Sequence, residues 1–392
     1  MSKPLVTFED FIRRILKVVL WVVALAILIS VPMYYVLSDL FRFSINLFTA
    51  PTNLIAFLFG LLSTEPFKTL FAMTVFPGFS FVALYGTVFM GWVERKFTAK
   101  IQLRTGPMYA GKVEGILQNV ADFFKLLFKE IIIPNGVDRA TFLAIPFALM
   151  AVVGALVALV PLSSTTYIAN PAVGAILVFA ILGFSPLIVL LAGWASNSKY
   201  PFLGGLRALH QMVAYEIPLV LSLVGAVILS GALNLAPLVP GGTSIVTAQS
   251  KVWFIFLQPL GAMVFYIGAL AELERIPFDL PEADSEIVAG WQTEYTSMLF
   301  GTFQLANFSR MYVLAGLFTT FFLGGWLGPA PIPPEVWFIL KTTVMMLLLM
   351  LPRSILPRVR IDLLLRAGWV KLLVLAFVNI FLTMIIVSFG VV

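Results

Sequence analysis

Long apolar segments recur along the chain and are separated by short polar ones. A helix needs about 20 apolar residues to cross the hydrocarbon core of a bilayer. Nearly uncharged runs of that length lie at 18–38, 69–93, 140–161, 172–193, 212–233, 252–271, 309–328, 336–352 and 372–392. The alternating ten-residue segments of a membrane β-barrel do not occur. The pattern therefore predicts an all-α polytopic membrane protein with about nine transmembrane helices.

Basic residues are concentrated in alternate connecting segments. The N-terminal segment together with 94–139, 195–211, 272–308 and 353–371 holds 20 of the 25 Lys and Arg residues. Cytoplasmic segments of membrane proteins carry an excess of these residues. We therefore expect a protein of the cell (inner) membrane with its N-terminus in the cytoplasm and its C-terminus outside the cell. The uncharged stretch 43–64 is interpreted as interfacial or re-entrant, because a tenth span there would place the basic N-terminus and the basic segment 94–139 on opposite sides of the membrane.

Composition agrees with a membrane protein and narrows the chemistry. The 392 residues are 60% hydrophobic and 11% charged, against about 25% charged residues in soluble domains, which excludes a soluble enzyme. Without cysteine and with one histidine, His210, the chain is not expected to hold a metal, an iron–sulfur cluster or a bis-histidine haem. No nucleotide-binding glycine motif or nucleophile elbow is found, and no nucleic acid partner is expected. Any electrons must be carried by another chain.

The inner segment 94–139 is long for a connection between bundled helices, and such loops tend to be functional or to dock a partner. Within it, apolar residues recur at helical spacing over 113–133, opposite charged ones. This spacing predicts an amphipathic helix lying on the inner face of the membrane.

Carboxylates gather in the inner segment 272–297. It contains seven of the 19 acidic residues, with only Arg275 opposing them. They are Glu272, Glu274, Asp279, Glu282, Asp284, Glu286 and Glu294. Interleaved apolar residues and two prolines indicate a structured, part-buried loop, with a solvated acidic surface as the alternative. Because clustered carboxylates in a low dielectric repel one another, some hold protons near neutral pH. The loop is therefore a candidate for taking up and passing protons.

Another carboxylate, Glu216, lies at the start of an otherwise apolar span. A carboxylate inside the membrane is costly and marks an ion or proton pathway by default. The alternative is an interfacial Glu216 that pairs with Arg207 or His210, and His210 is either structural or a proton relay.

Basic residues late in the chain divide into two groups. Two of them, Arg310 and Lys341, fall inside predicted spans. The inner arginines fit either lipid headgroups or a docked acidic subunit. These arginines are Arg353, Arg358, Arg360 and Arg366.

Several segments resemble, in order, the H-type membrane subunit of respiratory complex I, which is also called subunit 1. The motifs are GluArgLys at 94–96, GlnLeuArgThrGlyPro at 102–107, LeuGlnAsnValAlaAspPhePheLysLeuLeuPheLysGlu at 117–130, AsnSerLysTyrProPheLeuGlyGlyLeuArgAla at 197–208, GlnMetValAlaTyrGluIlePro at 211–218, ArgIleProPheAspLeuProGluAlaAspSerGlu at 275–286 and ArgValArgIleAspLeuLeuLeuArgAlaGlyTrp at 358–369. The resemblance implies an H-type membrane domain of eight helices at 69–392. It leaves 1–68 as an N-terminal extension with one transmembrane helix and an interfacial or re-entrant stretch.

The resemblance also implies a role for individual residues. Those of a quinone chamber or its entrance are Glu94, Arg95, Gln102, Arg104, Asp122 and Glu130. Those that couple quinone reduction to proton movement are Glu216, Arg275, Asp279, Glu282, Glu286 and Glu294. Iron–sulfur subunits of a hydrophilic arm and antiporter-like membrane subunits are the implied partners, beside the lipid bilayer. A quinone-like acceptor is the implied substrate, with no cofactor held by this chain alone.

Two positions depart from the family pattern. Asn307 stands where a glutamate is common, which removes one step of the proton path or routes it through water, and Glu274 replaces a commonly neutral residue. Similar subunits serve membrane-bound hydrogenases and deazaflavin- or ferredoxin-linked dehydrogenases, so an ion-coupling subunit of that kind is one alternative. A stand-alone carboxylate-driven transporter is another, although the inverted repeats expected of it are not evident.

Overall fold

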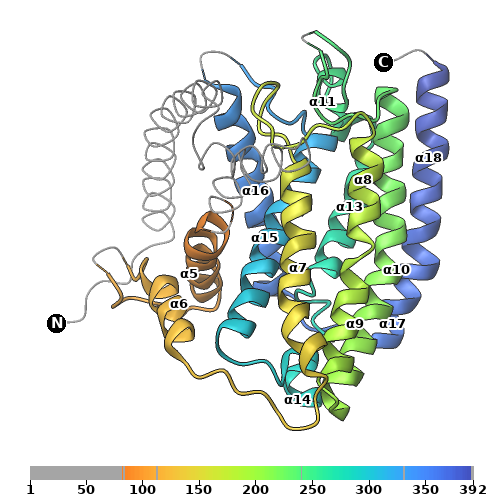
Figure 1. Ribbon diagram of the computed structural model, residues 1–392. Helices are drawn as coiled ribbons and strands as arrows, with labels where there is room; N and C mark the ends of the chain where they lie inside the picture. Colours follow the sequence, from red (N-terminus) through yellow and green to blue (C-terminus); the bar gives the residue numbers. More distant parts are fainter. Residues whose placement is uncertain (1–81, 83, 112–113, 240, 330–331, 390–392) are drawn as a thin grey trace, which may run out of the picture. The chain divides into compact units, whose positions relative to one another are not determined.

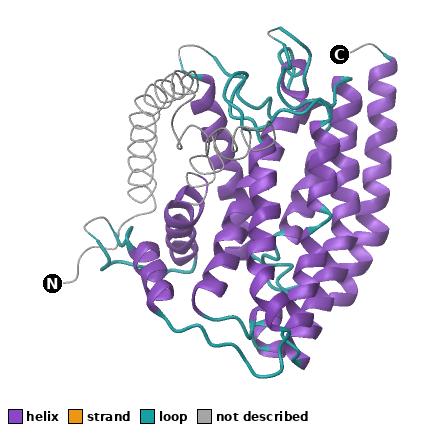
Figure 2. Ribbon diagram, in the orientation of Figure 1, coloured by secondary structure: helices purple, strands orange, loops and turns teal. Residues whose placement is uncertain are grey.

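The computed structural model describes residues 82, 84–111, 114–239, 241–329 and 332–389. Every regular element in these residues is a helix, and none is a strand (Figure 1, Figure 2). The predicted all-α class is therefore confirmed for this part of the chain.

Most predictions for the N-terminal part concern residues that the structure does not describe. The extension 1–68, its span 18–38 and its stretch 43–64 lie outside the described residues, as does most of the predicted span 69–93. That span ends in helix, because η2 (Leu84–Met90, a π-helix) continues directly into α5 (Gly91–Ile101).

The remaining helices follow in chain order. They are α6 (Gln118–Phe128), α7 (Arg139–Leu159), α8 (Gly174–Leu182), α9 (Ser185–Ala195), α10 (Lys199–Ser230), α11 (Ile245–Ala248), α12 (Phe254–Leu257), α13 (Pro259–Glu272), α14 (Asp284–Ile287), η3 (Gly290–Gln292), α15 (Ser297–Phe322), α16 (Pro334–Ile355), α17 (Ile361–Arg366), η4 (Ala367–Leu372) and α18 (Leu373–Ser388).

Several of these helices have the length of a membrane span. Five segments are long and apolar enough to cross a bilayer: Arg139–Leu159, Gly174–Ala195, Lys199–Ser230, Pro334–Ile355 and Ile361–Ser388. Each of them overlaps a predicted span. The predicted spans 252–271 and 309–328 correspond to the shorter apolar helix α13 and to the 26-residue α15, which carries the polar Asn307 and Arg310. A multi-pass membrane protein follows.

The largest boundary difference is at α10, which begins at Lys199 rather than at the predicted 212. The apolar run stops at Arg207 and His210, but polar residues do not end a helix, so α10 continues past the apolar part. Its other end is set locally, because Gly231 adopts a left-handed backbone with φ +62°, the usual conformation after a helix C-terminus.

Helix α18 shows which solvent surrounds the bundle. Its buried residues are the small or polar Ala376, Asn379 and Thr383. Its exposed residues are large and apolar, with 64% of Phe381 and 51% of Ile385 accessible. Such a pattern is the reverse of a helix on a soluble protein and fits contact with lipid.

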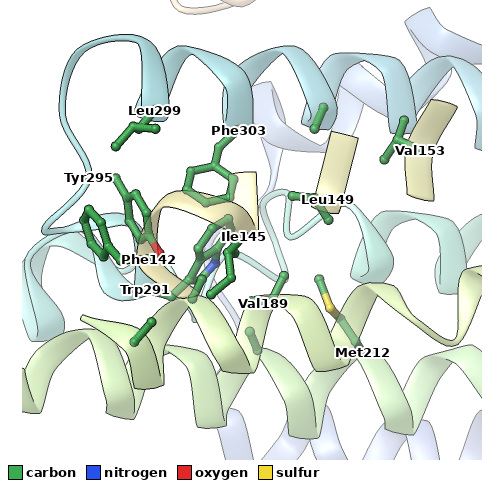
Figure 3. Packing of buried hydrophobic residues seen from close by; sticks show 14 residues of the cluster. Phe142, Ile145, Leu149, Val153, Val189, Met212, Trp291, Tyr295, Leu299 and Phe303 are labelled. Atoms are coloured by element: carbon green, nitrogen blue, oxygen red, sulfur yellow. The ribbon is translucent and has the colours of Figure 1, made fainter. Parts of the chain in front are cut away.

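Helix α10 packs against α9, α13 and α18, while α15 packs against α7 and α16. A core cluster between α7, α9, α10 and α15 also includes aromatic residues of the acidic segment (Figure 3). Tyr295 stacks on Phe142 with ring centroids 4.1 Å apart, and Trp291 meets Phe303 edge-on at 4.9 Å. These rings anchor the acidic segment to the bundle, so it is a structured loop, as predicted, rather than a solvated one.

The amphipathic helix predicted over 113–133 is α6, which has no buried residue and exposes Phe123, Phe124 and Leu127. It is shorter than predicted, because Gly115 has a left-handed φ of +74° before it and Lys129 is extended after it.

A lysine caps the C-terminal end of α15. The Lys341 ammonium donates to the carbonyl oxygens of Leu323 at 2.7 Å, Gly325 at 3.1 Å and Leu327 at 2.7 Å. It also lies 4.4 Å from the centroid of the Trp253 ring. Carbonyls at a helix C-terminus lack partners within the helix and favour a cation. Lys341 therefore ties α16 to the end of α15.

We expect Lys341→Met to lower the stability of the detergent-solubilised protein by about 2 kcal/mol or more, because hydrogen bonds to charged groups contribute roughly 1.5–3 kcal/mol each. Thermal unfolding measures the change. Lys251→Met removes an exposed lysine and is the matched control. Equal melting temperatures for the two variants would contradict the role given to Lys341.

Candidate functional site

A buried carboxylate, Glu94, lies between two arginines that come from distant parts of the chain. Glu94 is on α5 and is 4% exposed. Its Oε1 is 2.8 Å from Arg275 Nη1, and Arg353 Nη1 donates a short hydrogen bond to the same oxygen. Burial alone would raise the pKa of Glu94, but the two guanidinium groups outweigh it and hold the pKa below its ordinary value. Glu94 is therefore an ionised carboxylate at neutral pH.

A cavity of about 110 Å³ opens beside these arginines. Its charged lining consists of Glu274, Arg275, Asp279, Glu282 and Arg353. The rest is Leu273, Ile276, Gln304, Asn307 and Phe308. Arg275 also lies 5.7 Å from the centre of the Phe308 ring. The cavity combines carboxylates, guanidinium groups and an aromatic ring, so it can receive a polar head and exchange protons with it.

Two carboxylates of the cavity titrate near neutral pH. Burial raises the pKa of Glu274 to about 7, although the Arg310 charge and a hydrogen bond from Trp291 act in the opposite direction. Burial, and then the neighbouring carboxylates Glu274 and Asp279, raise the pKa of Glu282 to about 8. Clustered acids that hold protons near pH 7 are what the sequence predicts for this loop.

The carboxylates continue from the loop into the membrane. Glu272, at the end of α13, is 2% exposed, and its Oε1 lies 3.5 Å from Nη1 of the fully buried Arg310. Glu216, on α10, is close enough to interact electrostatically with Glu272. Its carboxylate faces the junction of α8 and α9, where a Cβ on Gly183 would be 3.1 Å from Glu216 Oε1. Glu216, Glu272, Glu274 and Glu282 thus form a chain of acids.

The pairing of Glu216 with a neighbouring base is not observed. Arg207 instead binds Glu286, with Nη1 2.5 Å from Oε2. His210 Nδ1 lies 2.7 Å from the carbonyl oxygen of Leu206 one turn before it. These contacts leave the other interpretation of Glu216, a carboxylate within the span that marks a proton pathway.

Two inner arginines contact acids of this chain rather than standing free for lipid or a partner. One is Arg353, which binds Glu94 as described. The other is Arg358, whose Nη2 lies 2.9 Å from Asp279 Oδ2. Sequence separations of 259 and 79 residues explain why the pattern of charges did not reveal these pairs.

The two inner segments meet at the start of α15. Ser297 Oγ donates to the carbonyl oxygens of Leu126 at 3.0 Å and Lys129 at 2.6 Å. The backbone N–H of Ile132 donates to Thr296 Oγ1 at 3.1 Å. These bonds hold the end of α6 against the acidic loop, so the long inner segment and the acids form one assembly.

Other predicted residues lie further from the cavity. Arg95 Nη1 is 2.6 Å from Asp122 Oδ2 in an exposed pair that joins α5 to α6. Gln102, Arg104 and Glu130 are exposed. Glu294 is half-buried beside the Tyr295 ring cluster and does not line the cavity. None of these residues reaches the cavity itself.

Three residues of the site were not predicted as such. Glu272 was counted only among the acids of the loop, Glu274 was noted besides as a departure from the family pattern, and Arg310 was noted only as a charge within a span. Asn307, which stands where the resemblance expects glutamate, accepts a 2.9 Å hydrogen bond from Arg310 Nη2 and lines the cavity. A lone arginine in an apolar run was the available signal, since such charges need a buried partner.

Comparison with known proteins identifies the family of the chain. The family model described as NADH dehydrogenase matches residues 74–384. A protein of Bacillus cytotoxicus, named as the H subunit of NADH-quinone oxidoreductase, is 45% identical over 297 residues, which are 75% of this chain and 87% of the relative. Proteins of the same name from Bacillus cereus and Anoxybacillus flavithermus are 44% identical over the same shares. This chain belongs to the NADH dehydrogenase family of membrane subunits, which includes the H subunit of NADH-quinone oxidoreductase.

Proposed function

We propose that this chain is the membrane subunit of a complex I-type, proton-pumping NADH-quinone oxidoreductase. It forms part of the quinone chamber and couples quinone reduction to proton translocation, while partner subunits carry the electrons from NADH. The names of the relatives favour this function over a hydrogenase-type subunit or a stand-alone transporter.

One observation supports the coupling role above all others. The cavity beside Glu94 and Arg275 is lined by Glu274 and Glu282, and these acids lead to Glu272 and Arg310 on membrane helices. Reduction of a quinone consumes two protons. A carboxyl group with a pKa of about 8, as in Glu282, can supply a proton near neutral pH and regain one afterwards. The adjoining acids would pass the change in charge into the membrane.

The assignment of partners and orientation completes the proposal. The inner assembly of α6 and the acidic loop would face the cytoplasm, where iron–sulfur subunits dock, and antiporter-like subunits would lie beside the bundle. The excess of Lys and Arg in the inner segments supports this orientation. A quinone is the substrate that the Glu94–Arg275 side of the cavity would receive.

Glu282→Gln tests the coupling role, because an amide accepts no proton at this position. We expect inverted membrane vesicles containing the assembled complex to lose at least about tenfold in NADH-driven proton translocation, the lower part of what a general acid–base group contributes. A pH-sensitive dye measures translocation, and NADH oxidation by a soluble quinone analogue is measured beside it.

Glu216→Gln should have the same effect on translocation, and Glu335→Gln should have none. Glu335 lies at the start of α16, where it accepts a hydrogen bond from Thr166 and takes no part in the acid chain. Wild-type translocation by both Glu282→Gln and Glu216→Gln would overturn the proposed function.

A further inference from the structure

Arg310 is a buried charge within a transmembrane helix, and the function proposed above gives it no role. It lies near the middle of α15 and has no exposed surface. An arginine inside the membrane is costly and persists where it has a partner or a function. A contribution to stability alone does not account for it, since apolar residues in place of a buried ion pair are often as stable or more so.

The contacts of Arg310 leave part of its guanidinium unused. Nη1 lies 3.5 Å from Glu272 Oε1, which is at the long end for a charged hydrogen bond, and Nη2 donates to Asn307 Oδ1 at 2.9 Å. Among the described residues, Nε has no hydrogen-bond partner, and neither has the other Glu272 oxygen, Oε2. A guanidinium has five donors in a fixed fork, so this pair is not the saturated, bidentate pair typical of a purely structural bridge.

The charge of Arg310 reaches beyond Glu272 to the carboxylates of the acidic loop. Its positive charge opposes the effect of burial on the pKa of Glu274 and of Glu282. Glu274 Oε1 has no hydrogen-bond partner in the part of the chain that the structure describes. On the membrane side, Glu216 interacts with Glu272. Arg310 therefore stands between the acids of the loop and the acid on α10.

Charge balance limits how many of these groups are ionised together. The field of this guanidinium acts on Glu272, Glu274 and Glu282, and Glu216 adjoins Glu272. Asp279 adds a negative charge beside Glu282, and Arg353 adds a positive one. In a low dielectric, each further negative charge is strongly disfavoured unless a positive charge lies near it. One ionised carboxylate with three protonated ones is the arrangement that leaves the fewest uncompensated charges.

We propose that Arg310 is a positioning residue that lowers the cost of ionising Glu272 and makes proton transfer along the acid chain sequential. This role rests on the proposed function. Once Glu216 has passed its proton onward, the carboxylic acid of Glu272 transfers its proton to the Glu216 carboxylate, and the guanidinium compensates the Glu272 carboxylate that remains. The next transfer, from the carboxylic acid of Glu282 or Glu274 to the Glu272 carboxylate, makes Glu272 neutral again and leaves the donor as the ionised group. Each step moves one proton and leaves the total charge unchanged.

Arg310→Met and Arg310→Lys test this role in the assembled complex. Without the guanidinium, Glu274 and Glu282 keep their protons to higher pH, so proton release along the chain needs a higher pH. We expect the pH profile of NADH-driven proton translocation by Arg310→Met vesicles to shift upward by roughly one unit, the lower end of what removal of a neighbouring charge produces. Arg310→Lys, which keeps the charge, should restore the wild-type profile. Arg366→Met removes an exposed arginine and should leave the profile unchanged.

A purely structural role of Arg310 would predict a smaller amount of assembled complex, with the pH profile of translocation unshifted. An unshifted profile for Arg310→Met, measured on the complex that does assemble, would overturn the inference. The proposed function would survive that result as long as Glu282→Gln and Glu216→Gln lose translocation.

A second measurement checks the pairing if Arg310→Met assembles poorly. Glu272→Gln leaves a buried guanidinium with Asn307 as its hydrogen-bond partner, whereas the double variant Glu272→Gln with Arg310→Met leaves no charge. We expect several-fold more assembled complex for the double variant than for Glu272→Gln, quantified by native gel electrophoresis of solubilised membranes. Equal or smaller amounts for the double variant would show that the two charges do not depend on each other, which contradicts the inference.

Discussion

Glu94→Gln should abolish most quinone-linked activity of the complex, with a loss of at least about tenfold. The carboxylate compensates Arg275 and Arg353 together, and removing one partner of a buried pair costs about 3–5 kcal/mol. Half of the Arg353 side chain is exposed, so solvent screens that arginine and the main loss comes from Arg275. NADH oxidation with a quinone analogue in membranes measures activity, and immunoblotting measures how much of the chain is present.

The same substitution should alter how stability depends on pH. The pKa of Glu94 is lower in the folded protein than its ordinary value of 4.5. Its contribution to stability is therefore complete above about pH 4.5 and is lost as the pH falls through the lower, folded-state pKa. Glu94→Gln lacks this dependence, so the difference in melting temperature between wild type and variant should shrink as the pH is lowered below 4.5.

Asp362→Asn is the matched control for Glu94→Gln. Asp362 pairs with Arg360 at 3.4 Å, and both side chains are mostly exposed, 61% and 81%. Surface pairs of this kind contribute roughly 0–1 kcal/mol, so activity should stay near wild type. A Glu94→Gln complex as active as Asp362→Asn would show that the carboxylate is dispensable and that the cavity does not need its two arginines compensated.

Much of the fold could be predicted from the sequence, because the membrane imposes a simple rule on it. Spans such as 140–161 and 336–352 are read from length and apolarity alone, and they correspond to α7 and α16 within a few residues. Boundaries were less predictable where polar residues continue a helix into the inner segment. The early start of α10, and of α15 at Ser297, are of this kind.

The acids of the site were visible in the sequence, but their partners were not. Seven carboxylates in one segment indicate mutual repulsion without further information. Which of them is buried depends on packing between distant elements, such as the Tyr295 ring on Phe142 of α7. The arginine that compensates Glu94 from α16 is 259 residues away. No local spacing encodes a contact of that range, so the charge at Arg353 could equally serve lipid or a partner.

Gly290→Ala should have the largest effect on the acidic loop, and we expect little or no assembled complex. Gly290 has a left-handed φ of +57°, and a Cβ there would lie 1.7 Å from the carbonyl oxygen of Pro281. It would also lie 3.4 Å from the Cα of Glu282. Because the clash is with backbone rather than with the end of a flexible side chain, the segment that carries Glu282 must move.

A glycine at the other end of the bundle separates the clash from backbone strain. Gly231 has nearly the same φ, +62°, and a Cβ on it would meet nothing within 4 Å. Gly231→Ala therefore carries only the cost of a left-handed alanine, about 1–2 kcal/mol, and should assemble with modestly reduced thermal stability. Native gels and translocation assays on both variants make the comparison. If Gly290→Ala assembles and pumps as well as Gly231→Ala, the turn between Pro281 and Gly290 is not what holds Glu282 at the cavity, and the acid chain must tolerate a shift of its central member.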